Sequence, residues 1–422
     1  MRIYISFLVK NKTLRYPDFK NYLVMRFMLI MSLHMQTTII SYLVYRLTKD
    51  PIALGMLGLW EVIPAIGLSF ISGPVIDHRE KKGTLTQCII LYLLLSAMFV
   101  VLATHWFQQA AGIDVTVWLI YLGIFISGGI RAFLSPANFA LMGTIVPRKL
   151  YANATTWSST AWQTGAVIGP LLGGAMIAIS GFEASLGSII GFQLIALYAL
   201  ARIPKQALIQ KAKEPILKSL KEGLQFVFKT QAIMAALSLD MFAVLFGGAV
   251  ALLPVYADDI LHVGEVGYGW LRAAPAIGAI ICLAILSVIP LKTKAGMKLL
   301  WSIAAFGITT IIFGISTSFV LSFTMLLLGG LFDSVSVVIR GTILQLYTPD
   351  EMRGRVASVN TMFISSSNEL GALESGLTAK WMGTVNAVIF GGAMTLLIVW
   401  ITYLKAPILK TLKLDPNEQD KT

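Results

Sequence analysis

Long apolar segments follow one another along almost the whole chain, and short polar stretches separate them. A helix of about 20 apolar residues matches the thickness of the hydrocarbon core of a bilayer. The chain is 56% hydrophobic and only 13% charged, which is too little charge to cover the surface of a soluble protein of 422 residues. These features predict an all-α protein that crosses a membrane many times.

The apolar pattern delimits twelve membrane-spanning helices, six on each side of a polar stretch. They are predicted at residues 22–47, 53–76, 84–104, 116–146, 152–179, 185–203, 232–257, 266–290, 298–316, 321–347, 356–380 and 386–404. The predicted domains are an N-terminal six-helix bundle at 1–203, a cytoplasmic linker at 204–231, a C-terminal six-helix bundle at 232–405 and a cytoplasmic tail at 406–422. Within the linker, residues 215–229 are expected to form a helix on the membrane surface.

The distribution of Lys and Arg predicts the orientation. Of the 33 basic residues, 26 fall in segments on one side of the predicted spans, three fall on the other side or at its edges, and four lie within spans. Because cytoplasmic loops carry the excess of positive charge, both termini are expected in the cytoplasm of a bacterial inner (plasma) membrane. The net charge of +12 is then a property of loops beside a bilayer, and no nucleic-acid partner is expected.

One four-residue motif occurs twice in the sequence, each time after one of two near-identical motifs. The words "SLHM" and "PAIG" begin at residues 32 and 64, and "SLDM" and "PAIG" begin at residues 238 and 275. Each pair falls in equivalent predicted spans, the first and second of each half. Parallel repeats of this kind, related by an axis along the membrane normal, are typical of alternating-access carriers. The alternative is a helical bundle that transports nothing.

The stretch "GPVIDHREKKG" lies between the second and third spans, with Gly73 four residues before Asp77. Two basic residues complete it, Lys81 and Lys82. It resembles the signature loop of the major facilitator superfamily, G-x-x-x-D-[RK]-x-G-[RK]-[RK], and departs from it at His78 and Glu80. The alternative for the basic residues is a cytoplasmic loop with no further role.

The resemblance implies a cytoplasmic gate. Asp77 would face the N-terminus of the eleventh span, where unsatisfied N–H groups favour an anion. Arg353 and Arg355 stand beside that terminus in the sequence and are expected to pair with Asp77. Gly73 would let two helices approach closely.

The fifth span contains "GAVIGPLLGG", in which Gly165, Gly169 and Gly173 recur every four residues. Such a stripe allows close helix packing, and Pro170 removes a backbone donor. With Gly174, the segment resembles the G-x-x-x-G-P-x-x-G-G motif that marks exporting antiporters of the superfamily. Packing alone is the alternative.

The resemblance extends over nearly the whole chain. The stretches "YLVYRLTKDPIALG", "SPANFALMGTIVP" and "TPDEMRGRVASVN" are similar to the macrolide-efflux and enterobactin-exporter type of bacterial carriers. That resemblance implies the major facilitator fold, with two pseudo-symmetric six-helix bundles, and a substrate cavity lined by the first, fourth, seventh and tenth spans.

Ionisable residues inside spans are costly and are functional candidates. Those predicted to couple transport to protons are Asp240, Asp333, Glu369, Glu374, His34 and Arg131. Buried carboxylates can load and release a proton as their surroundings change. Alternatives remain, because His34 can be an ordinary polar interface residue, and Arg26 and Arg340 can snorkel to water near the inner ends of their helices.

Aromatic and methionine side chains suit amphipathic solutes, and the predicted cavity liners are Trp162, Met241, Phe242 and Phe246. Contact with lipid is the alternative for each. The sequence holds no nucleotide-binding loop, no metal-ligand spacing and no nucleophile constellation, so neither a cofactor nor a metal is expected.

These observations predict a monomeric secondary active transporter, not an enzyme. It would export small amphipathic organic compounds, such as drugs or siderophore-like molecules, by proton-coupled alternating access. Its partners would be the substrate, protons and the lipid bilayer. The alternatives are a lysophospholipid flippase or a uniporter and, with external loops too short to build an active site, a polytopic membrane enzyme.

Overall fold

The computed structural model describes residues 12–205, 216–288, 294–349 and 352–412. All regular elements in these ranges are helices, which confirms the all-α prediction. By their contacts, the residues form two units. The first contains residues 1–47 and 63–213, and the second contains residues 48–62 and 214–422.

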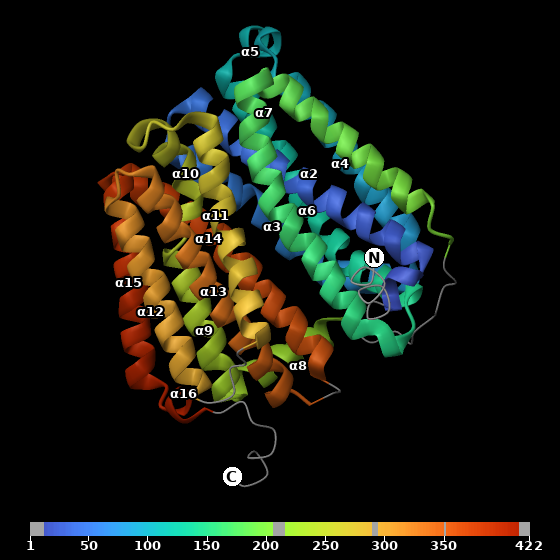
Figure 1. The fold of residues 1–422 in the computed structure, drawn as a ribbon, viewed down its shortest axis with the longest axis vertical. Coiled ribbons are helices and arrows are strands. Elements are labelled where there is room, and N and C mark those ends of the chain that lie inside the picture. The colour runs from blue at the N-terminus through green and yellow to red at the C-terminus, as the bar shows by residue number, and fades with distance from the viewer. Residues whose placement is uncertain (1–11, 206–215, 289–293, 350–351, 413–422) are drawn as a thin grey trace, which may run out of the picture. The chain divides into compact units, whose positions relative to one another are not determined.

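The first unit consists mainly of long helices that follow one another in the sequence (Figure 1). They are α2 (Pro17–Thr48), α3 (Pro51–His78), α4 (Lys81–Ala103), the short α5 (His105–Ala111), α6 (Ile113–Ile145) and α7 (Tyr151–Ala201). Helix α4 packs against α6 and α7. Helix α3 is continuous, yet its first part, up to Val62, belongs to the second unit.

The second unit has α9 (Gln231–Phe246) at its centre, packed against α13 (Phe319–Tyr347), α14 (Arg353–Met382) and α15 (Thr384–Lys405). Three short elements extend α9, and these are η3 (Ala249–Leu252), α10 (Leu253–Val255) and η4 (Tyr256–Ile260). The remaining helices are α11 (Gly264–Val288), α12 (Ala295–Ile315) and the short α16 (Ile408–Thr411). The buried side chains of α9, α12, α13 and α14 form one apolar core.

Ten described helical segments are long and apolar enough to cross a membrane. Helix α7 counts once among them, although Gly181 breaks it with φ 74° and ψ −179° at the boundary between the predicted fifth and sixth spans. Helix α14 has 30 residues, but its serine, asparagine and charged side chains keep it outside this group. The prediction of twelve spans therefore depends on counting α7 as two and α14 as one.

Equivalent contacts appear in the two units and reflect the repeat in the sequence. In the first unit, Gly129 of α6 faces Pro64 and Leu68 of α3. In the second, Gly330 of α13 faces Pro275 of α11. Both prolines begin a "PAIG" word, so the repeated word occupies the same helix–helix interface in each half.

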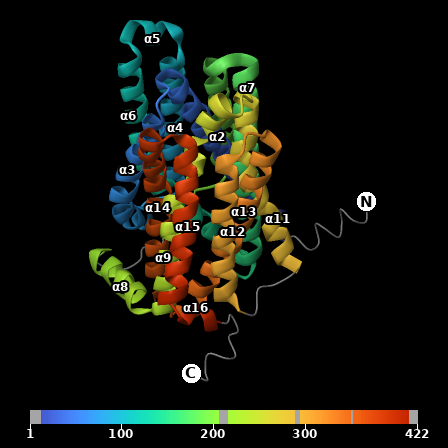
Figure 2. The ribbon, with the colours of Figure 1, turned by 90° about the vertical axis from the view of Figure 1, so that its left-hand side faces the viewer.

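The predicted linker contains helix α8 (Ile216–Lys229), as expected from the sequence. Figure 2 shows α8 lying obliquely to the long helices of the second unit, and its contacts are with α9 and α14. Val227 is fully buried in this contact. Gly223 permits close approach, since a Cβ there would lie 3.0 Å from the Arg355 carbonyl oxygen.

Candidate functional site

The second unit holds a buried group of charges between α9 and α13. Arg340 of α13 forms an ion pair with Asp240 of α9, and each side chain is only 5% exposed. Ser336 donates a hydrogen bond to Oδ1 of Asp240 over 3.4 Å. Asp333 lies close enough to interact electrostatically with both Asp240 and Arg340. We call Asp240, Asp333, Ser336 and Arg340 the charge cluster.

Helix periodicity explains how α13 presents three of these residues together. Asp333, Ser336 and Arg340 are separated by three and four positions, the spacing that places side chains on one face of a helix. Because α9 packs directly against α13, Asp240 meets this face. The charge cluster therefore results from one polar stripe on α13 and one acid on its neighbour.

The structure corrects the sequence-based interpretation of Arg340. The sequence favours snorkelling of Arg340 to water, but its side chain is buried against Asp240. The seven-residue spacing from Asp333 is the signal that could have identified it, because two turns return an α-helix to almost the same face. Arg26 is only partly buried, and its Nε donates to the carbonyl oxygen of Ser158 over 3.1 Å, so its access to water stays a prediction.

Burial makes the charge cluster sensitive to any change of its charge. Opposite charges attract strongly where water is excluded, and a single buried charge without its partner is costly. The cluster contains two carboxyl groups and one guanidinium group, so it carries a net negative charge when both acids are ionised. One proton added to a carboxyl group would balance it.

In the first unit, the equivalent position on α2 is His34. Its ring packs edge-on against Trp162 of α7, with the ring centroids 5.7 Å apart. Nearby, a Cβ at Gly169 would lie 2.6 Å from the Met31 carbonyl oxygen, and one at Gly165 would lie 3.0 Å from the Met31 nitrogen. The glycine stripe of the predicted exporter motif therefore forms the α2–α7 interface.

The rest of that motif follows the same helix. A Cβ at Gly173 would lie 3.4 Å from the Met35 carbonyl oxygen, so the contact is tightest at Gly169 and looser at Gly173. Pro170 lies inside α7, and both it and Gly174 are buried.

The other charged candidates belong to other helices. Arg131 is an exposed residue of α6. Glu369 and Glu374 are half-buried residues of α14, and the Glu369 carbonyl oxygen would lie 2.6 Å from a Cβ at Gly58 of α3. These three residues stay predictions as proton-coupling groups.

The predicted cytoplasmic gate is described in part. The side chains of Asp77 and Arg353, and the surroundings of Gly73, lie outside the described part of the structure. Arg355 forms an ion pair with Glu222 of α8.

The two lysines of the signature loop differ in their contacts. Lys82 donates to the carbonyl oxygens of Ala201, over 3.0 Å, and Ile203, so it caps the C-terminal end of α7. Lys81 donates to the carbonyl oxygen of Arg79 over 3.2 Å.

The predicted cavity liners have different surroundings. Trp162 and Phe242 are 40% and 41% exposed, respectively, so both rings present an accessible face. Met241 is half-buried. Phe246 packs edge-on against Phe390 of α15, with the ring centroids 6.4 Å apart, and so it also contributes to packing within the second unit.

Sequence reasoning missed a second buried polar group, in the first unit. The Ser96 hydroxyl lies 2.9 Å from Oε1 of Gln36 and 3.1 Å from Oε1 of Gln193, and the three side chains come from α4, α2 and α7. All three residues are buried. Their uncharged chemistry contrasts with the charge cluster of the second unit. Among the described residues, no three His, Cys, Asp or Glu side chains are grouped to hold a metal ion.

Comparisons with known proteins identify the family. The sequence model of the family described as transmembrane secretion effector, a branch of the major facilitator superfamily, matches residues 14–421. The enterobactin exporter EntS of Escherichia coli O1:K1 / APEC is 27% identical over 283 residues, which is 67% of this chain and 66% of that protein. EntS of Shigella boydii serotype 18 is 27% identical over 284 residues. The chain thus matches just under two thirds of the length of these relatives.

Solved structures show the same fold. A POT family transporter in complex with 5-aminolevulinic acid has a TM-score of 0.73 at 12% identity, covering 94% of this chain and 97% of that one. A bacterial homolog of the human lysosomal transporter Spinster, in an inward-facing and unoccupied conformation, has a TM-score of 0.64 at 15% identity, covering 93% and 96%. The chain is therefore a multi-pass membrane protein that belongs to the transmembrane secretion effector family of the major facilitator superfamily.

Proposed function

We propose that this protein exports small amphipathic organic compounds, including siderophore-like molecules, in exchange for protons. The observation that carries the proposal is the buried Asp240–Arg340 ion pair with Asp333 beside it. Ionisable groups inside a membrane are costly, and carriers retain them where a proton or substrate passes. The similarity to enterobactin exporters supports the substrate class.

The charge cluster suggests how one proton would be exchanged. When both acids are ionised, Arg340 is shared between Asp240 and Asp333. A proton that binds Asp240 neutralises that carboxylate and frees Arg340 to pair with Asp333. Release of the proton on the other side restores the original pair. The two arrangements differ in how α9 and α13 are held together, and such a difference is needed if protonation is to bias access.

The remaining predicted residues take auxiliary roles in this proposal. Glu369, Glu374, His34 and Arg131 are secondary candidates for proton transfer. Asp77, with Arg353 and Arg355, would close the cytoplasmic side, and the glycine stripe of α7 would set the packing against α2. Residues 1–203 and 232–405 would be the two moving bundles, with both termini in the cytoplasm and residues 204–231 as the linker.

Everted membrane vesicles test the proposal directly. In them the cytoplasmic face points outward, so export appears as uptake from the medium. Radiolabelled enterobactin and an amphipathic fluorescent dye serve as probes. We expect uptake of at least one probe to be faster when the vesicle lumen is more acidic than the medium. Collapse of this pH gradient with an ionophore should abolish the acceleration. Uptake that ignores the gradient would contradict proton coupling and favour a uniporter.

Lysophospholipid transport is the remaining alternative, and the same vesicles address it. A fluorescent lysophospholipid is added in place of the organic probes, and its movement between leaflets is followed by quenching. Protein-dependent flipping, without uptake of either organic probe, would replace the proposed substrate class.

Substitutions locate the proton site. Asp240→Asn and Asp333→Asn should each reduce gradient-driven uptake at least tenfold while substrate exchange without a gradient continues. Glu183→Gln, at an exposed acid near the break in α7, is the matched control and should transport normally. Driven uptake that is unchanged in both cluster variants would remove the charge cluster from the mechanism.

A further inference from the structure

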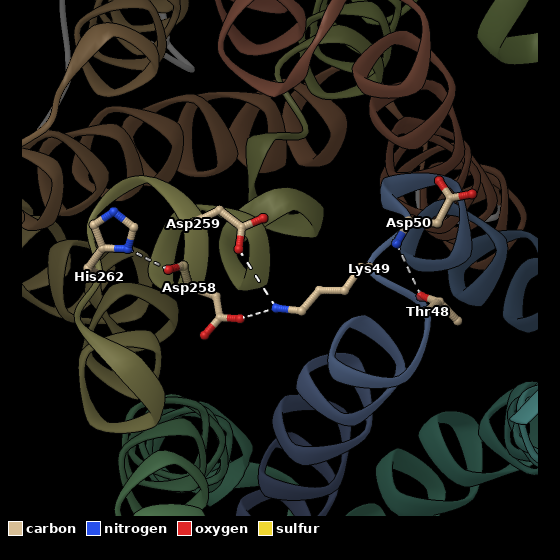
Figure 3. Close-up of polar contacts among 6 residues, drawn as sticks. All are labelled: Thr48, Lys49, Asp50, Asp258, Asp259 and His262. Atoms are coloured by element: carbon tan, nitrogen blue, oxygen red, sulfur yellow. Dashed lines mark hydrogen bonds and ion pairs between the residues drawn. The ribbon is translucent and has the colours of Figure 1, made fainter.

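Ion pairs of the second unit hold the turn between α2 and α3, and Figure 3 shows those made by Lys49. Lys49 of this turn forms ion pairs with two acids of η4, Asp258 and, at 3.8 Å, Asp259. Asp50, the next residue, accepts from Lys380 near the end of α14 over 2.9 Å. We call these five residues the turn network.

The backbone of the turn aims the two charges in different directions. Lys49 has φ 49°, in the left-handed region that a side chain such as lysine rarely adopts. Asp50 caps the helix that follows, because its Oδ1 accepts from the Ile52 N–H over 3.1 Å. The Asp50 N–H in turn lies 3.3 Å from the Thr48 hydroxyl. A strained residue therefore carries the cation, and the cap residue carries the anion.

Close helix packing lies directly beside the turn network. A Cβ at Gly376 of α14 would come within 2.9 Å of the Gly55 Cα and the Pro51 carbonyl oxygen of α3. A Cβ at Gly58 would come within 2.6 Å of the Glu369 carbonyl oxygen. The first turns of α3 thus contact the backbone of α14 without intervening side chains.

The connectivity of this segment is unusual. Residues 48–62 group with the second unit, while α2 before them and the rest of α3 after them belong to the first. Any movement of α2 and α3 must therefore either carry this segment along or break its contacts. The network lies where α2, α14 and the extension of α9 end, which is the face expected to be external from the distribution of positive charge.

We propose that the turn network is a reversible external gate, which docks residues 48–62 on η4 and α14 and releases them when the carrier opens to the outside. The exposure of its side chains fits this role. Lys49 is 52% exposed and Lys380 is 56% exposed, so water competes for each ion pair. Exposed pairs contribute little individually, which permits opening in every cycle, whereas several pairs together with glycine packing hold the closed form.

Hydrogen–deuterium exchange on the full chain in nanodiscs tests the gate without requiring a known substrate. Lys49→Gln removes the cation shared by Asp258 and Asp259. Asp50→Asn removes the charge that faces Lys380 but keeps a good helix cap, so it separates the ion pair from the cap. We expect each variant to raise amide exchange in residues 48–58 by about two- to fivefold, the upper part of the range expected when an exposed pair is lost.

Two control variants test whether the change in exchange is specific to the turn network. The exchanged pair Lys49→Asp with Asp258→Lys restores opposite charges at these two positions and should lower exchange below that of Lys49→Gln, although Asp259 then faces an acid. Lys405→Gln, an exposed lysine at the end of α15, should leave exchange in residues 48–58 unchanged. Exchange within twofold in both Lys49→Gln and Asp50→Asn would overturn the proposal, as would an equal rise with Lys405→Gln.

A thiol probe measures opening itself. Ala53→Cys places a thiol at a position that is only 8% exposed in the closed segment. The chain's own thiols, Cys88 and Cys282, are both buried and give a low background. We expect a membrane-impermeant methanethiosulfonate to react about two- to fivefold faster when Lys49→Gln is added, and high salt to have a similar effect because exposed pairs are screened. An unchanged rate under both conditions would contradict a gate.

Discussion

Helices α2 and α9 begin the two halves of the chain and differ at one repeated position. In α2 the position is His34, whose ring packs against Trp162. In α9 it is Asp240, which forms a buried ion pair with Arg340. The words around them differ by this one letter, "SLHM" against "SLDM". The repeat has therefore kept the helix and changed its chemistry.

The same division runs through each unit. The buried polar group of the first unit is neutral, formed by Gln36, Ser96 and Gln193. That of the second unit is charged. A duplicated bundle supplies two similar frames, and only one of them has to bear the cost of burying charge. This difference is why the proposal places the main proton site in the second unit.

The largest test of this comparison removes the anion from the charge cluster. Asp240→Ala removes the ion-pair partner of Arg340 and leaves only Asp333 near its buried charge, and we expect a loss of about 2–3 kcal/mol of stability. His34→Ala, at the equivalent position, loses mainly a ring contact and should cost about 1 kcal/mol. Thermal unfolding of the purified variants in one detergent compares the two.

A double variant separates the buried charge from packing. Asp240→Leu with Arg340→Met replaces the ion pair by apolar side chains and should recover part of the lost stability, because the only acid left in the cluster is Asp333, which a proton can neutralise. Equal losses for Asp240→Ala and His34→Ala would show that the two units do not differ in this way.

The next test compares the two contacts made by the repeated "PAIG" words. A Cβ at Gly330 would lie 2.1 Å from the carbonyl oxygen of Pro275, so Gly330→Ala must push two backbones apart. We expect it to cost about 1–3 kcal/mol. A Cβ at Gly129 would lie 3.3 Å from the flexible end of Leu68, so Gly129→Ala should change stability by less than about 1 kcal/mol. Unfolding temperatures that fall equally would contradict the tighter packing of the second unit.

Much of the fold could be predicted from the sequence, because apolar length determines where a helix can cross a bilayer. Helices α2, α3, α4 and α6, and the helices from α11 to α15, lie where the apolar pattern places them, whereas the short α5 falls in a predicted connection. The conformation of the break in α7 could not be predicted. A single glycine, Gly181, makes the turn between two predicted spans, where the apolar pattern predicts a loop over residues 180–184.

The candidate site was only partly predictable, for a different physical reason. Hydropathy selects Asp240 and Asp333 because a charge in a span is costly, whatever its partner. It does not show which cation neutralises them, since that depends on which faces of α9 and α13 meet. Arg340 is accordingly assigned to water by the sequence alone. The charges of the turn network likewise look like ordinary loop residues, because ion pairs across 209 positions of sequence leave no local pattern.

Within the first unit, the glycine stripe offers a graded test of the packing role. Gly169→Ala would place a Cβ 2.6 Å from the Met31 carbonyl oxygen, whereas Gly173→Ala would place one 3.4 Å from its nearest neighbour. We expect the first to cost about 1–2 kcal/mol and the second to be neutral or slightly stabilising, because alanine favours helix. Unfolding temperature and transport are measured together. If Gly173→Ala abolishes transport without loss of stability, the stripe has a role in transport beyond packing.

The smallest expected effect on stability concerns the contacts that hold one helix end in each unit, at the predicted cytoplasmic side. In the second unit, the start of α14 is tied to α8 by the Arg355–Glu222 ion pair, with side chains 25% and 34% exposed. Partial exposure weakens such a pair, so Glu222→Gln should cost less than about 1 kcal/mol, and raising the salt concentration should shrink the difference further. In the first unit, Lys82 caps the carbonyl oxygens that end α7, which is a hydrogen-bonded contact with backbone groups. The stability lost by Lys82→Met should therefore depend less on salt concentration than the stability lost by Glu222→Gln. If the loss caused by Glu222→Gln is instead the less salt-dependent of the two, packing of α8 and not charge holds the helix end in the second unit.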